Sequence, residues 1–210
     1  MARGRFITFE GGEGTGKSTQ ARLLCERLRG QGHEVVQTRE PGGSQGAEQL
    51  RKLLLEGEKD RWSPISETLL MYAARRDHLE KVITPALEGG AWVVCDRFLD
   101  STRAYQGAGG GAPESLITAL EQEIVGARRP DLTLVLDLPV ETGLERAVGR
   151  SMLDRFEAMD RDFHQRLRTA FLAIAAQEPA RCVVIDSTPP REEVCARIWQ
   201  AVQDRLGPSA

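Results

Sequence analysis

The chain has 210 residues, of which 40% are hydrophobic, and it carries 28 Lys and Arg against 31 Asp and Glu, a formal net charge of −3. This length and composition predict one compact soluble domain and exclude a disordered chain. The slightly acidic balance excludes non-specific binding to nucleic acid or to an anionic membrane. Any phosphate that the protein binds must therefore be held by local groups.

The first apolar stretch is too short for a signal peptide, and no run approaches the ~18 apolar residues that a membrane span needs. The four cysteines form no C-x-x-C pair, and the three histidines lie far apart in the sequence. These features favour a cytoplasmic protein whose cysteines are reduced, without a zinc site or a disulfide.

Short apolar runs, rich in β-branched residues, predict five buried strands. They lie at residues 6–9, 35–36, 92–95, 132–136 and 182–185. Helical patterns predict seven helices around them. They lie at roughly 17–31, 44–56, 66–89, 113–127, 140–150, 160–178 and 190–206. This alternation predicts an α/β fold with a parallel sheet of about five strands flanked by helices, in which ligands bind at the carboxyl ends of the strands.

Three segments between these elements are expected to be loops: Gly42 and Gly43, residues 107–112, and residues 150–160. The last segment has mixed charge, and is either a cover over the site or a plain junction between two helices. No repeat or Pro/Ser/Gly-rich linker divides the chain, so we expect residues 1–210 to form a single domain.

The segment after the first predicted strand matches the phosphate-binding pattern G-x-x-x-x-G-K-[ST]. Its residues are Gly11, Gly12, Glu13, Gly14, Thr15, Gly16, Lys17 and Ser18, and a helix is predicted to follow from about residue 17. Backbone N–H groups in such a loop point at phosphate oxygens, and the helix N-terminus adds a positive dipole end. Lys17 would bridge phosphates, and Ser18 would bind Mg²⁺.

Other residues narrow the class of P-loop protein to which the chain could belong. The guanine-reading sequence N-K-x-D of GTPases is absent, and motor ATPases usually exceed this length. Arg39 follows the second predicted strand, and Asp96 and Arg97 follow the third. Asp96 is suited to hold Mg²⁺ directly or through water, and Arg97 to hold a second phosphate through its two-pronged guanidinium. Taken singly, each arginine could equally form a surface ion pair.

The order of the motifs along the chain resembles bacterial thymidylate kinases. The matching segments are Gly11–Thr19, Thr38–Gly43, Tyr72–Arg75, Asp96–Phe98, Ser101–Gly107 and Arg129–Thr133. The resemblance implies the three-layer nucleoside monophosphate kinase fold with a lid at about 150–160. It also implies that the protein transfers the γ-phosphoryl group of ATP to dTMP in dTTP biosynthesis. Mg²⁺ as a cofactor and a homodimeric state are implied as well.

The resemblance also implies roles for single residues. Residues 11–19, including Thr19, would bind ATP, and Arg39 and Arg97 would hold the phosphate of dTMP. Arg75 would read the edge of thymine. Thr102 and Gln106 would lie near base or sugar, Tyr105 would pack under the deoxyribose where a 2′-hydroxyl would crowd it, and Glu13 would meet the 3′-hydroxyl or a metal-bound water.

One position departs from the family. Members commonly have a phenylalanine two residues before the Ala-Ala-Arg tripeptide, as a platform on which thymine stacks, and here that stretch holds Met71 and Tyr72. Methionine is a flexible and less defined platform. Met71, Tyr72 and Phe98 are therefore the candidates for stacking.

Family members have one further cation that covers the transferring phosphoryl group, and it comes either from the P-loop or from the lid. Residues 12–15 hold no Lys or Arg, so the resemblance implies the lid variant, with Arg150 and Arg155 bridging the two phosphates and Arg146 as a weaker candidate. Those arginines could instead pair with acidic neighbours along a helix. Two other functions stay open: a kinase for a different nucleotide or nucleoside, and a P-loop regulatory protein.

Overall fold

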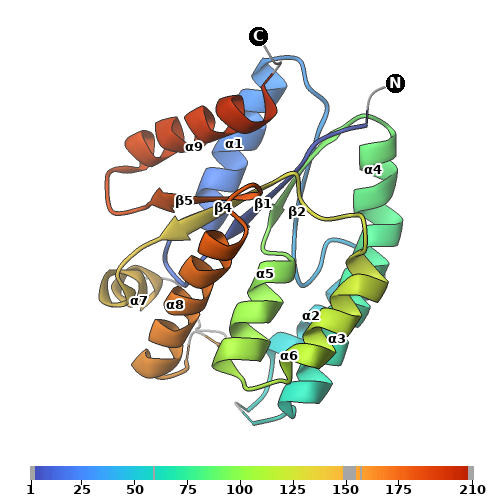
Figure 1. The fold of residues 1–210 in the computed structure, drawn as a ribbon, viewed down its shortest axis with the longest axis vertical. Helices are drawn as coiled ribbons and strands as arrows, with labels where there is room; N and C mark the ends of the chain where they lie inside the picture. The colour runs from blue at the N-terminus through green and yellow to red at the C-terminus, as the bar shows by residue number, and fades with distance from the viewer. Residues whose placement is uncertain (1–2, 59, 149–154, 157, 208–210) are drawn as a thin grey trace.

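The computed structural model describes residues 3–58, 60–148, 155–156 and 158–207. Its centre is a five-stranded sheet in the order β2-β3-β1-β4-β5 (Figure 1), in which every neighbouring pair runs parallel. The strands are β1 (Phe6–Glu10), β2 (Val35–Arg39), β3 (Trp92–Asp96), β4 (Leu132–Asp137) and β5 (Cys182–Asp186). The five-stranded parallel sheet flanked by helices is as predicted.

Helices cover both faces of this sheet. On one face, α1 (Lys17–Gly30) and α9 (Arg191–Leu206) pack side by side (Figure 1) against apolar side chains such as Phe9 and Leu134. On the other face, α3 (Pro64–His78) continues through the π-helical η1 (Leu79–Ile83) into α4 (Thr84–Glu88). Beside them α8 (Arg161–Gln177) packs on Val135 and Cys182. Strands covered on both faces are continuously apolar, which explains why the short runs predicted them.

Four further helical segments complete the described part of the fold. They are α2 (Gln45–Leu55), α5 (Leu99–Thr102) with the π-helical η2 (Arg103–Gly109), α6 (Glu114–Leu120) with the π-helical η3 (Glu121–Val125), and α7 (Val140–Val148). Among the described residues, none of the helices is both long and apolar enough to span a membrane.

The prediction of a loop at 107–112 is wrong for residues 107–109, because α5 and η2 form one helical run from Leu99 to Gly109. A Cβ atom on Gly109 would lie 2.6 Å from the ring of Phe163 and 3.0 Å from the side chain of Leu167. This glycine therefore permits close packing of the run against α8 and does not mark a turn. Of the expected lid, only residues 155, 156 and 158–160 fall within the described part of the chain.

Candidate active site

The P-loop lies at the carboxyl end of β1 and leads into α1. Gly16, the residue before α1, has φ +89°, a backbone conformation that favours glycine. Lys17 is 7% exposed, and its ammonium group donates to Gly12 O at 2.6 Å and to Thr15 Oγ1 at 3.3 Å. Burial lowers the pKa of Lys17 to about 8. The lysine is thus held over its own loop, where phosphate oxygens would replace these acceptors.

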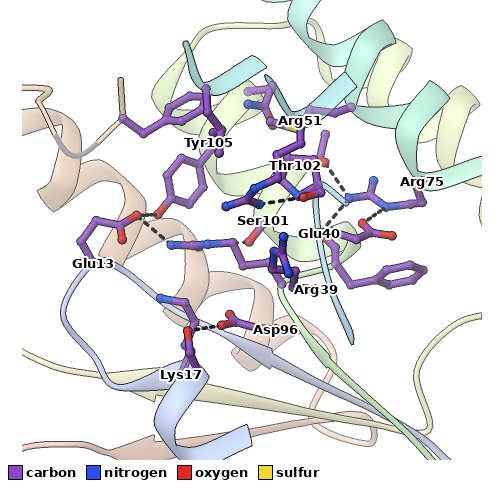
Figure 2. Close-up of a pocket in the computed structure, with 18 of the residues that line it drawn as sticks. Glu13, Lys17, Arg39, Glu40, Arg51, Arg75, Asp96, Ser101, Thr102 and Tyr105 are labelled. Carbon is purple, nitrogen blue, oxygen red and sulfur yellow. Dashed lines mark hydrogen bonds and ion pairs between the residues drawn. The ribbon is translucent and has the colours of Figure 1, made fainter. Parts of the chain in front are cut away.

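Asp96 closes β3 beside the start of α1. The Ser18 hydroxyl donates to Oδ2 of Asp96 (Figure 2 draws Asp96 beside Lys17), while Oδ1 is buried and has no hydrogen-bond partner among the described residues. A buried carboxylate oxygen without a partner is costly unless a cation or a donor completes it. A serine hydroxyl and one carboxylate, together with phosphate oxygens, are ligands that suit Mg²⁺.

Arg97 has an unusual backbone. Its φ of +69° is the single positive φ of a non-glycine residue in the described chain, and its N–H donates to Phe9 O at 2.9 Å. Its guanidinium donates to Gly11 O at 3.1 Å and to Glu13 Oε1 at 2.7 Å. Such strain is typical of functional sites, where the surroundings fix one conformation.

Glu13, Arg97 and Tyr105 form a compact group in the same cavity, and Figure 2 shows the side chains of Glu13 and Tyr105 pointing toward each other. The Tyr105 hydroxyl donates to Glu13 Oε1 at 2.5 Å, and the Arg97 guanidinium lies 4.8 Å from the centre of the Tyr105 ring. Burial opposes ionisation of Glu13, but Arg97 and Lys17 outweigh it and lower its pKa to about 2. The group therefore presents a fixed negative charge beside two cations.

Glu10, the last residue of β1, is a fully buried carboxyl group under the site. It accepts from Phe98 N at 2.8 Å, from Ser101 N at 3.2 Å and from Ser101 Oγ at 2.6 Å. These bonds fix the start of α5, which follows Arg97 in the chain. Burial, with Asp100 nearby, raises the pKa of Glu10 to about 7 from its ordinary value of 4.5.

The raised pKa of Glu10 predicts a pH-dependent stability. Because the folded state holds this proton more tightly than the unfolded state, the stabilisation is complete below about pH 4.5 and is lost as the pH rises through 7. Glu10→Gln does not titrate, and it can still accept from Phe98 N and Ser101 N with its amide oxygen while its NH₂ group donates to Ser101 Oγ. We expect the free energy of unfolding of Glu10→Gln, relative to the wild type, to rise by about 3 kcal/mol between pH 4.5 and 8.

Urea unfolding of both proteins at the two pH values measures this difference. Glu26→Gln, on the exposed face of α1, serves as the control and should follow the wild type. Parallel stability profiles for wild type and Glu10→Gln would show that Glu10 ionises normally.

The other end of the cavity carries polar groups from α3 and η2. Arg75 is 2% exposed (Figure 2 shows it beside Glu40), and it donates to Glu40 Oε2 at 2.8 Å, Phe98 O at 2.9 Å and Thr102 Oγ1 at 3.1 Å. Its Nη1 is buried without a hydrogen-bond partner among the described residues. Gln106 lines the same cavity. One nitrogen of Arg75 is therefore left to donate to a ligand.

Comparison with known proteins decides the family. The family model described as "Thymidylate kinase" matches residues 9–198. The thymidylate kinase of Caulobacter vibrioides is 60% identical over 207 residues, covering 99% of this chain and all of that protein, and the one of Bradyrhizobium diazoefficiens is 54% identical over 99% and 92%. The crystal structure of thymidylate kinase from Ehrlichia chaffeensis superposes with a TM-score of 0.79 at 35% identity, covering 96% of this chain and all of that one.

The chain belongs to the thymidylate kinase family. It is a phosphotransferase that converts dTMP to dTDP with ATP as the donor. The predicted family, fold and activity are thereby confirmed.

Most residues that the sequence assigned to the thymidylate kinase site line one cavity. They are Glu13, Gly14, Gly16, Lys17, Ser18, Thr19, Arg39, Met71, Arg75, Asp96, Arg97, Phe98, Thr102, Tyr105 and Gln106. The P-loop residues Gly11, Gly12 and Thr15 instead border a separate small cavity next to α7 and α8. Arg39 pairs with Glu48 at 3.1 Å while its side chain stays half exposed at the rim.

Two expectations need correction. Tyr72 is not a platform for thymine, because it does not line the cavity, whereas Met71 and Phe98 do. Its ring is packed in the core, and its hydroxyl donates to Ile117 O at 3.4 Å. Arg155 does not line the cavity in this conformation: its buried guanidinium pairs with Glu67 of α3 and lies 4.8 Å from the ring of Phe156. Arg150 lies outside the described residues.

Four charged residues in or behind the thymidylate kinase cavity were not predicted from the sequence. Glu40 and Arg51 line the cavity, and Glu10 and Glu67 are buried behind it. Arg51 of α2 lines the cavity and donates to Pro41 O at 2.7 Å. Glu40 had a usable signal, since it lies between Arg39 and the cis-proline Pro41 within a motif already selected. Glu10 and Glu67 had none, because their partners lie at least 39 positions away in the chain.

Proposed function

We propose that dTMP lies in the cavity between the P-loop and α3, with its thymine at the Arg75 end. The observation that supports this is the pair of groups offered to a base edge. Arg75 Nη1 is a buried donor without a partner among the described residues, and Gln106 on η2 lines the same cavity. Thymine has a carbonyl oxygen next to an imide N–H, so it can accept from the arginine and donate to the amide oxygen of the glutamine.

Phe98 is the platform on which the thymine packs in this proposal, with Met71 on the other side. Both residues line the cavity, whereas Tyr72 does not. The Phe98 ring is fixed edge-to-face against Phe6, with their centres 5.0 Å apart, so it is more rigid than the methionine. The departure at Met71 from the family pattern would then leave one defined aromatic surface.

The phosphate of dTMP points to Arg97, with Arg39 and Arg51 at the same rim. Two phosphate groups brought together repel each other strongly in a site that excludes water, so several cations are needed to hold them. The Glu13–Tyr105 hydrogen bond closes the sugar side, where a 2′-hydroxyl would meet the Tyr105 ring. Glu13 would take the 3′-hydroxyl or a metal-bound water.

ATP would occupy the P-loop over residues 11–19, with its base in a second cavity of about 580 Å³. That cavity lies on the other side of Gly16 and Thr19, between Arg146 of α7 and the segment from Ser187 to Arg191 at the start of α9. Arg146 donates to Ser187 O at 3.3 Å, which joins the two walls. The phosphates of ATP would thus reach the dTMP cavity from the opposite side of the loop.

Mg²⁺ would be held by the Ser18 hydroxyl and the partnerless oxygen of Asp96, together with phosphate oxygens of ATP. The described residues hold no cluster of three or more His, Cys, Asp or Glu side chains able to bind a metal by themselves. Such a sparse set suits Mg²⁺, which keeps several waters and substrate ligands. When bound, the ion would neutralise charge on the transferring phosphoryl group.

The bridging cation over the two phosphates is Arg150 in this proposal, because Arg155 is paired with Glu67.

We also propose a homodimer. Large apolar side chains are exposed on α2 and α3, namely Leu53, Ile65 and Leu69 at 41–48%. A symmetric dimer that uses these two helices would cover them.

An acceptor panel tests the proposal. With ATP and Mg²⁺, we expect the highest kcat/KM for dTMP, a lower value for dUMP because it lacks one methyl group, and far lower values for UMP, CMP and AMP. A chelator should abolish turnover. Equal turnover of dTMP and CMP would contradict the placement of the base, and full activity in chelator would contradict the proposed metal site.

A further inference from the structure

Glu67 is a buried carboxylate that the mechanism above does not use. It lies on α3, two turns before Arg75 and one turn before Met71, so the three side chains share one face of the helix. Glu67 is 8% exposed and is not among the residues that line the dTMP cavity. It therefore lies one layer behind the side chains proposed to read the base.

The two oxygens of this carboxylate have two different donors. Gln106 Nε2 donates to Oε1 at 2.8 Å, and Arg155 Nη2 donates to Oε2. Residues from three segments that are distant in sequence thus meet at one group: the expected lid, α3 and η2. Glu67 and Gln106 are each less than one-tenth exposed, so water does not compete freely for these bonds.

The chemistry of this contact fixes the direction of the Gln106 amide. A carboxylate paired with a guanidinium offers acceptors alone, so Gln106 must turn its NH₂ group toward Glu67. Its carbonyl oxygen is then left for the cavity. A thymine N3–H can donate to that oxygen, whereas the N3 of cytosine is an acceptor and would be repelled.

We propose that Glu67 is a positioning residue for base selection: held by Arg155, it orients the Gln106 amide so that the enzyme accepts imide pyrimidines and rejects cytosine. The inference rests on the placement of dTMP proposed above. Through Arg155, it also links base recognition to the segment expected to form the lid.

Glu67→Gln tests the inference with a change of nearly the same shape. Because Arg155 can only donate, the new amide must turn its oxygen to Arg155 and its NH₂ to Gln106. Gln106 then accepts with its oxygen and presents its own NH₂ to the base, facing thymine N3–H with a second donor. We expect kcat/KM for dTMP to fall about 10- to 100-fold, mainly through KM, while that for dCMP does not fall.

Matched variants separate this effect from a loss of structure. Glu67→Ala leaves Gln106 free to turn, so its loss for dTMP should be smaller. In an Arg155→Met background, Glu67→Gln can turn its oxygen to Gln106 and should no longer disfavour dTMP. Glu80→Gln, an exposed residue just after α3, should behave as the wild type.

An unchanged dTMP-to-dCMP ratio of kcat/KM in a folded Glu67→Gln enzyme would overturn the inference. If that variant does not fold, Glu67→Ala gives the decision, because Gln106 loses the acceptor that fixes its amide. The dTMP-to-dCMP ratio must then fall, and an unchanged ratio overturns the inference. A wild-type enzyme without preference for dTMP over dCMP would instead overturn the placement of the base itself.

Discussion

Replacing Arg97 with alanine should lower kcat/KM for dTMP by about 10³-fold, the scale of losing a preorganised cation at a phosphoryl-transfer site. The side chain touches the P-loop at Gly11 O, the carboxylate of Glu13 and the ring of Tyr105. Its loss removes a charge that faces the acceptor phosphate and leaves Glu13 without its nearest cation. Steady-state kinetics with varied dTMP and saturating ATP measure this effect.

Arg97→Lys separates charge from shape. A lysine keeps the charge but cannot donate to Gly11 O and Glu13 in the fixed geometry of a guanidinium, so it should recover only a small part of the activity. Arg22→Ala, on the exposed face of α1, is the control for removal of an arginine. Near-normal activity of Arg97→Ala would mean that the acceptor phosphate binds elsewhere.

Asp96→Asn should lower kcat by about 10²- to 10³-fold and raise the Mg²⁺ concentration needed for half-maximal activity. The amide matches the carboxylate in shape and can still accept from Ser18, but it lacks the negative charge that attracts the ion. It can also turn its NH₂ group toward the position of Oδ1, which has no partner among the described residues. Titration of activity with Mg²⁺ at saturating substrates measures both quantities.

Asp204→Asn, an exposed change on α9, is the matched control and should leave the Mg²⁺ dependence unaltered. Thermal unfolding of both variants checks that neither loses structure. If Asp96→Asn lowers kcat but needs no additional Mg²⁺, the carboxylate supports the P-loop through Ser18 and does not bind the ion.

The parts of this site that the sequence predicted are those whose signals are local. The P-loop lies within eight consecutive residues, and Asp96 and Arg97 directly follow a run that only a buried strand explains. The chain order of the strands then places these groups on one edge of a parallel sheet. These predictions do not depend on how the helices pack against one another.

The parts that were missed depend on contacts between distant segments. Glu10 meets residues 88 and 91 positions later, and Glu67 meets Arg155 across 88 positions, so neither has a sequence signal. Tyr72 and Met71 are neighbours on α3 and point about 100° apart, so only one of them can face the cavity. Sequence alone did not fix the rotation of α3 about its axis.

The glycine-to-ring contact between η2 and α8 has a mechanical consequence. Gly109 leaves no room for even one methyl group against Phe163 and Leu167, and this helical run also carries Tyr105 and Gln106. Residues 150–160 lead directly into α8, which begins at Arg161. Because the contact is close-packed and barely compressible, a displacement of α8 that starts at that junction must also move the helical run from Leu99 to Gly109, which carries Tyr105 and Gln106.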